Sequence, residues 1–399
     1  MGPRTYFLGA AGLALAAVFL ASLTAAGAKV NPETNRIQLL LFGEGWTVTP
    51  TIMMTDPKIS VTFIAAGDST YASDMARYMR IHMPRNYEDW VSRVDTFMLS
   101  DLVPWGFTNE QFIWMRDSIE QEGTGLILSE MGWYGIGGWT GNAVEDWIKT
   151  PVYDAYPCDM IIDQQNQECP FLDLVHEGPF LDIPGIETVA FADEQGVHDP
   201  REGATVWARY RKGQEAAIVT RPFGQGVGVA NSMGVERFMQ PYYEWKFYRD
   251  YFINHVYKAA GVPVPDDLDL VHRIREQLHG FRDHRAYMIG MIDFIDKFNA
   301  NTRPVEEMLA NTLPLRDQAE DLYLDLRYEE AQEVMDQAIE MFEEIEAEAV
   351  KLREQALFWI YVIEWSAVSA TFLMTGIVIW ALMIRRRLYR EVSVTRRVG

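Results

Sequence analysis

The chain has 399 residues, 48% of them hydrophobic, and a formal net charge of −22. This length is enough for one or two packed domains, and so acidic a chain repels nucleic acid and anionic lipid headgroups. We therefore expect no nucleic-acid partner. The seven histidines are scattered without metal-ligand spacing, so we also expect no metal site and no cofactor.

Residues 1–28 have the features of a secretory signal peptide. Arg4 provides a positive charge, residues 6–23 form an apolar run, and small residues follow. The Ala26-x-Ala28 pattern predicts cleavage before Lys29. The alternative is an uncleaved N-terminal anchor, because the apolar run is almost long enough to span a bilayer.

Residues 29–263 predict an α/β domain. An amphipathic helix over 108–121, with a capping box at Thr108 and Gln111, separates two apolar segments, and this order is typical of a parallel sheet with crossover helices. A polar turn at 211–214 predicts a hairpin, and Tyr242 to Ala260 predicts an aromatic-rich helix. The expected strands are 36–42, 59–65, 94–99, 126–128, 205–210, 215–220 and 227–230.

The two cysteines, Cys158 and Cys169, flank a polar loop. In an oxidising compartment the default expectation is a disulfide, which would contribute roughly 2–3 kcal/mol by closing so short a loop. The competing reading is a catalytic thiol. Neither cysteine follows a predicted strand-to-helix turn, so we favour the disulfide.

Residues 264–356 predict an α-helical segment, which Pro304 and Pro314 divide into at least three helices. The last helix begins near Arg327 and is expected to run into the next segment without a break. Spacing of three and four residues indicates one apolar stripe: Ala331, Met335, Ala338, Phe342, Ile345, Ala349 and Leu352. Two readings stay open: a small bundle that supports the α/β domain, or a coiled-coil stalk that docks protein partners.

Residues 357–384 predict a transmembrane helix. Trp365 to Ile384 contains no charge and has the length that a bilayer core requires. Dense arginine in residues 385–399 predicts a cytoplasmic tail. The tail carries +5 and residues 1–28 carry +1, so the part between them carries −28. The chain is therefore expected in the cell membrane as a single-pass protein, with its acidic domain outside the cytoplasm.

Residues 37–261 resemble the class I glutamine amidotransferase-like fold, a flavodoxin-like α/β domain. The similar stretches are the strand with its Gly-Glu-x-Trp end at 39–46, the Asp-to-Ser-Asp strand at 95–101, the segment 119–128, a Gly-Pro element at 177–185, and the Gly-x-Gly strand at 223–230. The resemblance implies a cysteine at the turn after 126–128 and a His–Glu pair. The turn here begins Ser129-Glu130-Met131, without cysteine, and no His–Glu pair is evident, so we expect no glutaminase activity.

Acidic and aromatic residues follow the predicted strands at the edge where α/β sheets bind ligands. The candidate ligand-binding residues are Glu44, Trp46, Asp101, Glu130, Trp133 and Trp139. Carboxylates and flat rings of this kind could hold a sugar, an amine or a cation. The structural alternative is that Glu44 and Asp101 cap helices and the tryptophans belong to the core.

The leading functional hypothesis is a membrane-anchored domain without glutaminase activity, acting as a binding, sensing or scaffold subunit of a membrane-associated assembly. The alternative is an extracytoplasmic hydrolase on a carbohydrate or amide, using Glu44, Asp101 and Glu130. A third reading is a structural component of the cell envelope. Convergence of the three carboxylates in one open cleft would favour the enzyme.

Overall fold

The computed structural model describes residues 28–43, 48–66, 72–100, 104–129, 143–165, 171–189, 196–232, 244–298 and 300–395. The predicted signal sequence, up to Gly27, lies outside these ranges. The chain forms two compact units. The first comprises Met1–Glu276 with Glu320–Glu329, and the second comprises Gln277–Ala319 with Glu330–Gly399.

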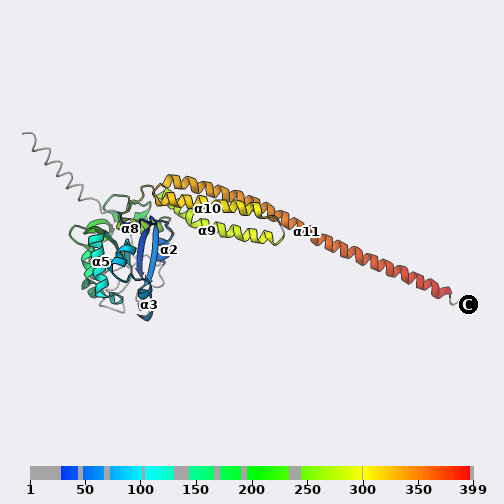
Figure 1. The fold of residues 1–399 in the computed structure, drawn as a ribbon, viewed down its shortest axis with the longest axis horizontal. Coiled ribbons are helices and arrows are strands. Elements are labelled where there is room, and N and C mark those ends of the chain that lie inside the picture. Colours follow the sequence, from blue (N-terminus) through cyan, green and yellow to red (C-terminus); the bar gives the residue numbers. More distant parts are fainter. Residues whose placement is uncertain are drawn as a thin grey trace, which may run out of the picture. The chain divides into compact units, whose positions relative to one another are not determined.

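The described residues of the first unit form a mixed ten-stranded sheet (Figure 1). Five strands run parallel in the order β2-β1-β3-β4-β10, which is the 2-1-3-4-5 order of flavodoxin-like sheets. These strands are β1 (Ile37–Gly43), β2 (Ile59–Ala65), β3 (Thr96–Ser100), β4 (Gly125–Ser129) and β10 (Gly226–Asn231). All five lie within about two residues of predicted strands.

The predicted parallel arrangement holds for these five strands and does not extend to the other half of the sheet. The remaining strands are β5 (Cys158–Gln165), β6 (Leu172–Leu174), β7 (Gly196–Pro200), β8 (Thr205–Tyr210) and β9 (Ala216–Phe223), and they pair antiparallel. The reversal occurs because β9 and β10 are joined by only Gly224 and Gln225, and a two-residue connection can link only antiparallel strands. The predicted hairpin is confirmed as β8 and β9.

Helices cover both faces of the parallel strands. On one face α3 (Ala72–His82), α4 (Tyr87–Arg93) and α5 (Asn109–Glu122) pack on Leu40, Phe42 and their neighbours. On the other, α2 (Thr49–Met53) and α8 (Tyr248–Ala260) pack on Leu39 and Leu41. This alternation of faces is that of a sheet buried on both sides. The shorter elements are η1 (Pro104–Gly106), α6 (Ala143–Ile148), η3 (Pro151–Ala155) and η4 (Ile186–Thr188).

Two helix predictions have clear outcomes in this unit. The capping box of α5 is confirmed, because the Thr108 hydroxyl accepts from the Gln111 N–H and the Gln111 side chain accepts from the Thr108 N–H. The aromatic helix α8 begins at Tyr248, six residues later than the predicted start at Tyr242.

Three helices follow the sheet: α9 (Leu268–Asp296), α10 (Arg303–Leu324) and α11 (Tyr328–Thr395). The prediction that Pro314 ends a helix is wrong, because Pro314 lies inside α10. A proline removes one backbone donor, but buried residues on both sides of it, Leu309 and Ala319, keep the helix packed.

Within the second unit, the first half of α11 packs on α9. The Phe281 and Phe342 rings meet at 5.0 Å, and Gln332 donates to the Gln277 side chain. Figure 1 shows α9 and α10 running beside this half of α11. The predicted stripe is buried from Ala331 to Ala349, and only Leu352 is half-buried. The first half of α11 is therefore part of a packed helical bundle, while the supporting role and the partner-docking role both stay predictions.

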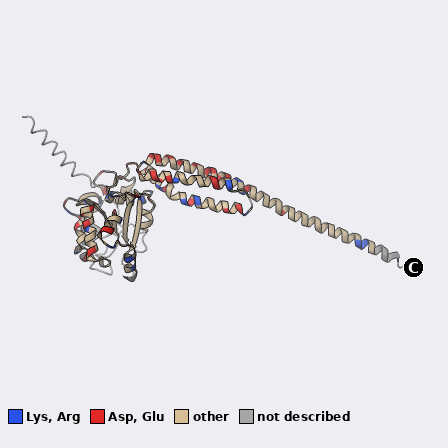
Figure 2. Cartoon of the chain, viewed as in Figure 1, with Lys and Arg blue, Asp and Glu red and all other residues tan. Residues whose placement is uncertain are grey.

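The second half of α11 is apolar and exposed. The helix is continuous through the predicted span, with a mean hydropathy of 2.1 over its most apolar window and none of that window buried. Figure 2 shows many acidic residues along the first half, a long stretch almost without charge, and basic residues near the end. The chain thus has a mixed α/β domain followed by a C-terminal helix that is long and apolar enough to cross a membrane.

Candidate functional site

The six predicted ligand-binding residues lie outside the described part of the chain. Glu44 and Trp46 follow β1, Asp101 follows β3, and Glu130, Trp133 and Trp139 follow β4. In the 2-1-3-4-5 order the strand order, not the strand direction, reverses between the parallel strands β1 and β3, which is where such sheets bind ligands. The described residues of β1, β3 and β4 end at this edge of the sheet, so the ligand-binding site stays a prediction.

The predicted disulfide also falls partly outside the described residues. Cys158 begins β5 and is buried with a free thiol, whereas Cys169 is not described. Burial raises the pKa of the Cys158 thiol well above its usual range, so it is protonated at neutral pH and poorly nucleophilic. A catalytic role for Cys158 is therefore disfavoured. The bridge itself stays a prediction.

The predicted resemblance would place a nucleophile at the turn that begins with Ser129. Ser129 ends β4 and is 1% exposed. Beside it is an enclosed space too small for a water molecule, lined by Met53, Met98, Ile127, Ser129, Asn231, Phe252 and His255. A nucleophilic serine needs both a base and room for substrate. The described surroundings of Ser129 give a substrate no access.

His255 is the titratable group of this space. Its Nδ1 donates to the Tyr251 carbonyl over 2.7 Å, because a carbonyl can only accept, and its Nε2 has no hydrogen-bond partner. Burial lowers the pKa of His255 to about 4, and the Tyr251 carbonyl opposes this only partly. His255 is therefore a neutral core residue near pH 7.

This buried histidine predicts an acid-sensitive fold. The unfolded chain takes up a proton near pH 6.5 and the folded chain only near pH 4, so His255 costs stability as the pH falls between these values. The loss from this residue is about 3 kcal/mol. We expect H255Q to flatten the difference in unfolding free energy between pH 7.5 and pH 4.5, measured by denaturant titration of the full chain in detergent.

The matched control is H279Q, at an exposed histidine of α9. It should keep the wild-type pH dependence. An unchanged pH dependence in H255Q would show that His255 is not buried in its neutral form.

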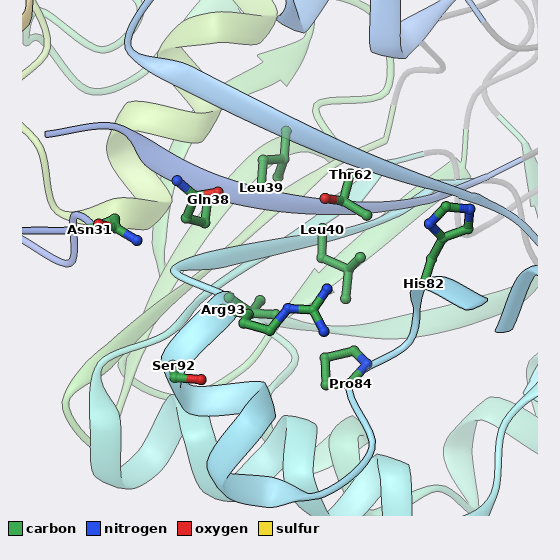
Figure 3. Close-up of a pocket in the computed structure, with 10 residues that line it drawn as sticks. Asn31, Gln38, Leu39, Leu40, Thr62, His82, Pro84, Ser92 and Arg93 are labelled. Atoms are coloured by element: carbon green, nitrogen blue, oxygen red, sulfur yellow. The ribbon is translucent and has the colours of Figure 1, made fainter. Parts of the chain in front are cut away.

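A shallow cleft of about 210 Å³ opens toward the amino ends of β1 and β2 (Figure 3). His82 at the end of α3 and Arg93 at the end of α4 line it together with Gln38 and Thr62 of the strands. Arg93 is paired with Asp89 over 3.3 Å. The cleft is smaller than the roughly 300 Å³ usual for ligand pockets and lies away from the carboxyl edge, so we assign it no ligand.

A cluster of charged side chains is buried beside α8. Arg275 of α9 pairs with Asp56 at 2.7 Å and with Asp250 of α8 at 2.5 Å, and all three are almost fully buried. His272 completes the arrangement at 2.6 Å from Asp250. Burial alone would raise the pKa of Asp250, but the hydrogen bond from His272 and the charge of Arg275 hold it below its usual range.

Asp56 is saturated with donors. Its Oδ2 accepts from the hydroxyls of Tyr257 and Tyr323, each over 3.0 Å, and its Oδ1 accepts from the Lys58 N–H over 2.7 Å. Arg275 also donates through Nε to the Tyr323 hydroxyl. A buried carboxylate with this many partners serves as a structural tie, since both of its oxygens already accept from protein donors.

This cluster fastens the turn between α10 and α11 to the α/β domain. Lys58 donates to the Leu324 carbonyl at the end of α10 over 2.6 Å, and Arg36 pairs with Glu320. These contacts explain why Glu320–Glu329 belongs to the same compact unit as the sheet. The sequence analysis did not identify this tie. The one sign of this buried cluster in the sequence was an aspartate, Asp250, among the aromatic residues of α8.

Comparisons with known proteins do not identify a family for this chain. No protein-family model matches the chain, and no curated protein matches it. The similar solved structures include cytoplasmic protein STM3548 from Salmonella typhimurium, with 15% identity and a TM-score of 0.43 over 56% of this chain and 99% of that one. Another is cytoplasmic protein STM1381 from Salmonella typhimurium LT2, with 14% identity and a TM-score of 0.43 over 55% and 98%.

A third similar structure is exo-beta-1,4-mannosidase Op5Man5 from Opitutaceae bacterium strain TAV5, with 8% identity and a TM-score of 0.33 over 56% of this chain and 36% of that one. Likeness at this level carries no functional argument. The function must be argued from the chain's own residues.

Proposed function

We propose that the chain is a membrane-anchored binding or scaffold subunit whose amidotransferase-like α/β domain is held outside the cytoplasm and lacks glutaminase activity. The observation that carries the proposal is the continuity of α11. One helix provides both the bundle core, through residues such as Phe342 and Ile345, and an apolar exposed half followed by Arg385, Arg386 and Arg387. An uncharged span with arginines at one end is typical of a single-pass anchor.

Two further observations support a role without catalysis. Ser129 lies beside a closed space. The buried carboxylates of Asp56 and Asp250 are both paired with Arg275. The order β2-β1-β3-β4-β10 supports the amidotransferase-like part of the proposal, because amidotransferase-like domains are flavodoxin-like.

The partner surface is proposed on the exposed acidic face of α11. Residues 329–348 contain nine acidic and no basic residues, and Glu333, Glu340 and Glu344 point away from the buried stripe. Such a field attracts a basic partner surface and repels anionic ones.

The test is purification of the tagged full chain in mild detergent after crosslinking in cells, with its co-purifying proteins identified. Charge reversal at Glu333, Glu340 and Glu344 to lysine should remove the partner. The matched control reverses three exposed acids of the α/β unit, Glu33, Glu110 and Glu202, and should keep it. Loss of the partner in the control alone would contradict docking through the helices. Glutamine hydrolysis that is lost in S129A would contradict the non-catalytic role.

A further inference from the structure

Helix α9 carries a second apolar stripe that faces away from the bundle core. Its inner stripe, with Met288, Ile292 and Ile295, is buried. On the outer side Tyr287 is 58% exposed, Phe294 42% and Phe298 37%. Their spacing of seven and four residues places the three on one side of the helix and of the turn that follows it. Large aromatic residues in such numbers on an outer face indicate a contact surface.

This outer stripe forms one wall of an apolar groove. The groove has a volume of about 580 Å³, and its other wall is α11, through Leu357 and Arg353. Tyr287, Met291 and Phe294 line the α9 side. The groove is thus mostly apolar, with the guanidinium of Arg353 at its wall.

The groove lies where α11 leaves the bundle. Ala356 is the last buried residue of α11 within the described chain, and Phe358 and Trp359, each 62% exposed, follow at once. From Phe358 to Ile384 the helix rises roughly 40 Å, which matches a bilayer with its headgroup regions included. If the apolar half of α11 spans the bilayer, Leu357 and the groove lie at headgroup depth.

The charges around the groove fit that depth. Residues 282–303 carry four basic and three acidic side chains, whereas all nine charged residues of 329–348 are acidic. Tyrosine and phenylalanine beside basic residues are favoured at the membrane interface, where rings enter the acyl boundary and cations meet phosphate.

We propose that the groove between α9 and α11 binds a phospholipid of the leaflet next to the bundle, with an acyl chain along Tyr287, Met291 and Phe294 and the phosphate at Arg353. The inference rests on the proposed membrane anchoring. It adds a second attachment, because the α9 end of the bundle then sits in the interface and the bundle cannot pivot freely about α11.

The experiment places a photo-crosslinking benzoylphenylalanine in the full chain, reconstituted in phosphatidylcholine–phosphatidylglycerol nanodiscs, and measures intact mass after irradiation. With the probe at Phe294 we expect an adduct of one phospholipid. The probe at Phe372, in the middle of the apolar half, should also give a lipid adduct. The probe at Val175, an exposed apolar residue of the α/β unit, should give none.

Three results would overturn the inference. A lipid adduct at Phe372 but none at Phe294 would leave the anchor intact and remove the groove site. A crosslink from Phe294 to a second copy of the chain would assign the groove to self-association. Equal lipid adducts at Val175 and Phe294 would show unspecific capture. Absence of lipid at Phe372 would refute the anchoring itself, so the two proposals fail separately. R353Q should lower the Phe294 adduct if the phosphate meets this guanidinium.

Discussion

Replacing Arg275 by methionine is expected to remove about 3–5 kcal/mol from the folding free energy, because Asp56 and Asp250 would then be buried without their cation. The measurement is denaturant unfolding of the full chain in detergent, followed by tryptophan fluorescence. The loss should be concentrated in the α/β unit, since all the partners of Arg275 lie there, including Tyr323 from Glu320–Glu329.

The matched control is R249M. Arg249 pairs with Glu276 over 2.8 Å, but both side chains are largely exposed to solvent. Exposed pairs contribute little, so the change should cost no more than about 1 kcal/mol. Similar losses in R249M and R275M would show that the buried cluster is not the tie described above. A double replacement, D56N with R275M, should cost less than the sum of the two single changes, because the two groups interact directly.

Ending the chain at Leu357 is expected to move the protein from the membrane fraction to the soluble fraction. The deletion removes the exposed apolar half of α11 and leaves the buried stripe up to Ala356 in place. Burial of about twenty apolar residues in lipid is effectively irreversible, so the change should be nearly complete. The assay is alkaline extraction of membranes followed by immunoblotting.

A chain ended at Ile384 serves as the control for this truncation. It lacks the arginine-rich tail but keeps the span, so it should stay in the membrane pellet. If the chain that ends at Leu357 also stayed in the pellet, another segment would have to hold the protein to the membrane. The N-terminal apolar run is the segment that would then be tested.

Local sequence patterns predicted the elements whose signal is periodic or chemical. Apolar runs located β1 and β2, the Thr108 capping box located the start of α5, and three- and four-residue spacing located the buried face of α11. These features depend on neighbouring residues. The antiparallel half of the sheet was not foreseen as a continuation of the parallel half, because strand direction follows from the short Gly224–Gln225 connection and from pairing across distant segments.

The buried tie could not be predicted for a related reason. Asp56, Asp250, Arg275 and Tyr323 come from four separate parts of the chain, and nothing in the local sequence of any one of them shows its partners. Pro314 misled the helix prediction, since packing on both sides outweighs one lost hydrogen bond. The acidic and aromatic residues at the sheet edge, Glu44 and Asp101 among them, stay predictions.

The most direct test of membrane anchoring with the domain outside is accessibility of introduced cysteines to a membrane-impermeant maleimide in intact cells. Val175→Cys, at an exposed position of the α/β unit, should be labelled in intact cells. Leu388→Cys, beyond Arg385–Arg387, should be labelled only after permeabilisation, with the unsubstituted chain giving the background from Cys158 and Cys169. Labelling of Leu388→Cys in intact cells, or protection of Val175→Cys, would contradict this topology.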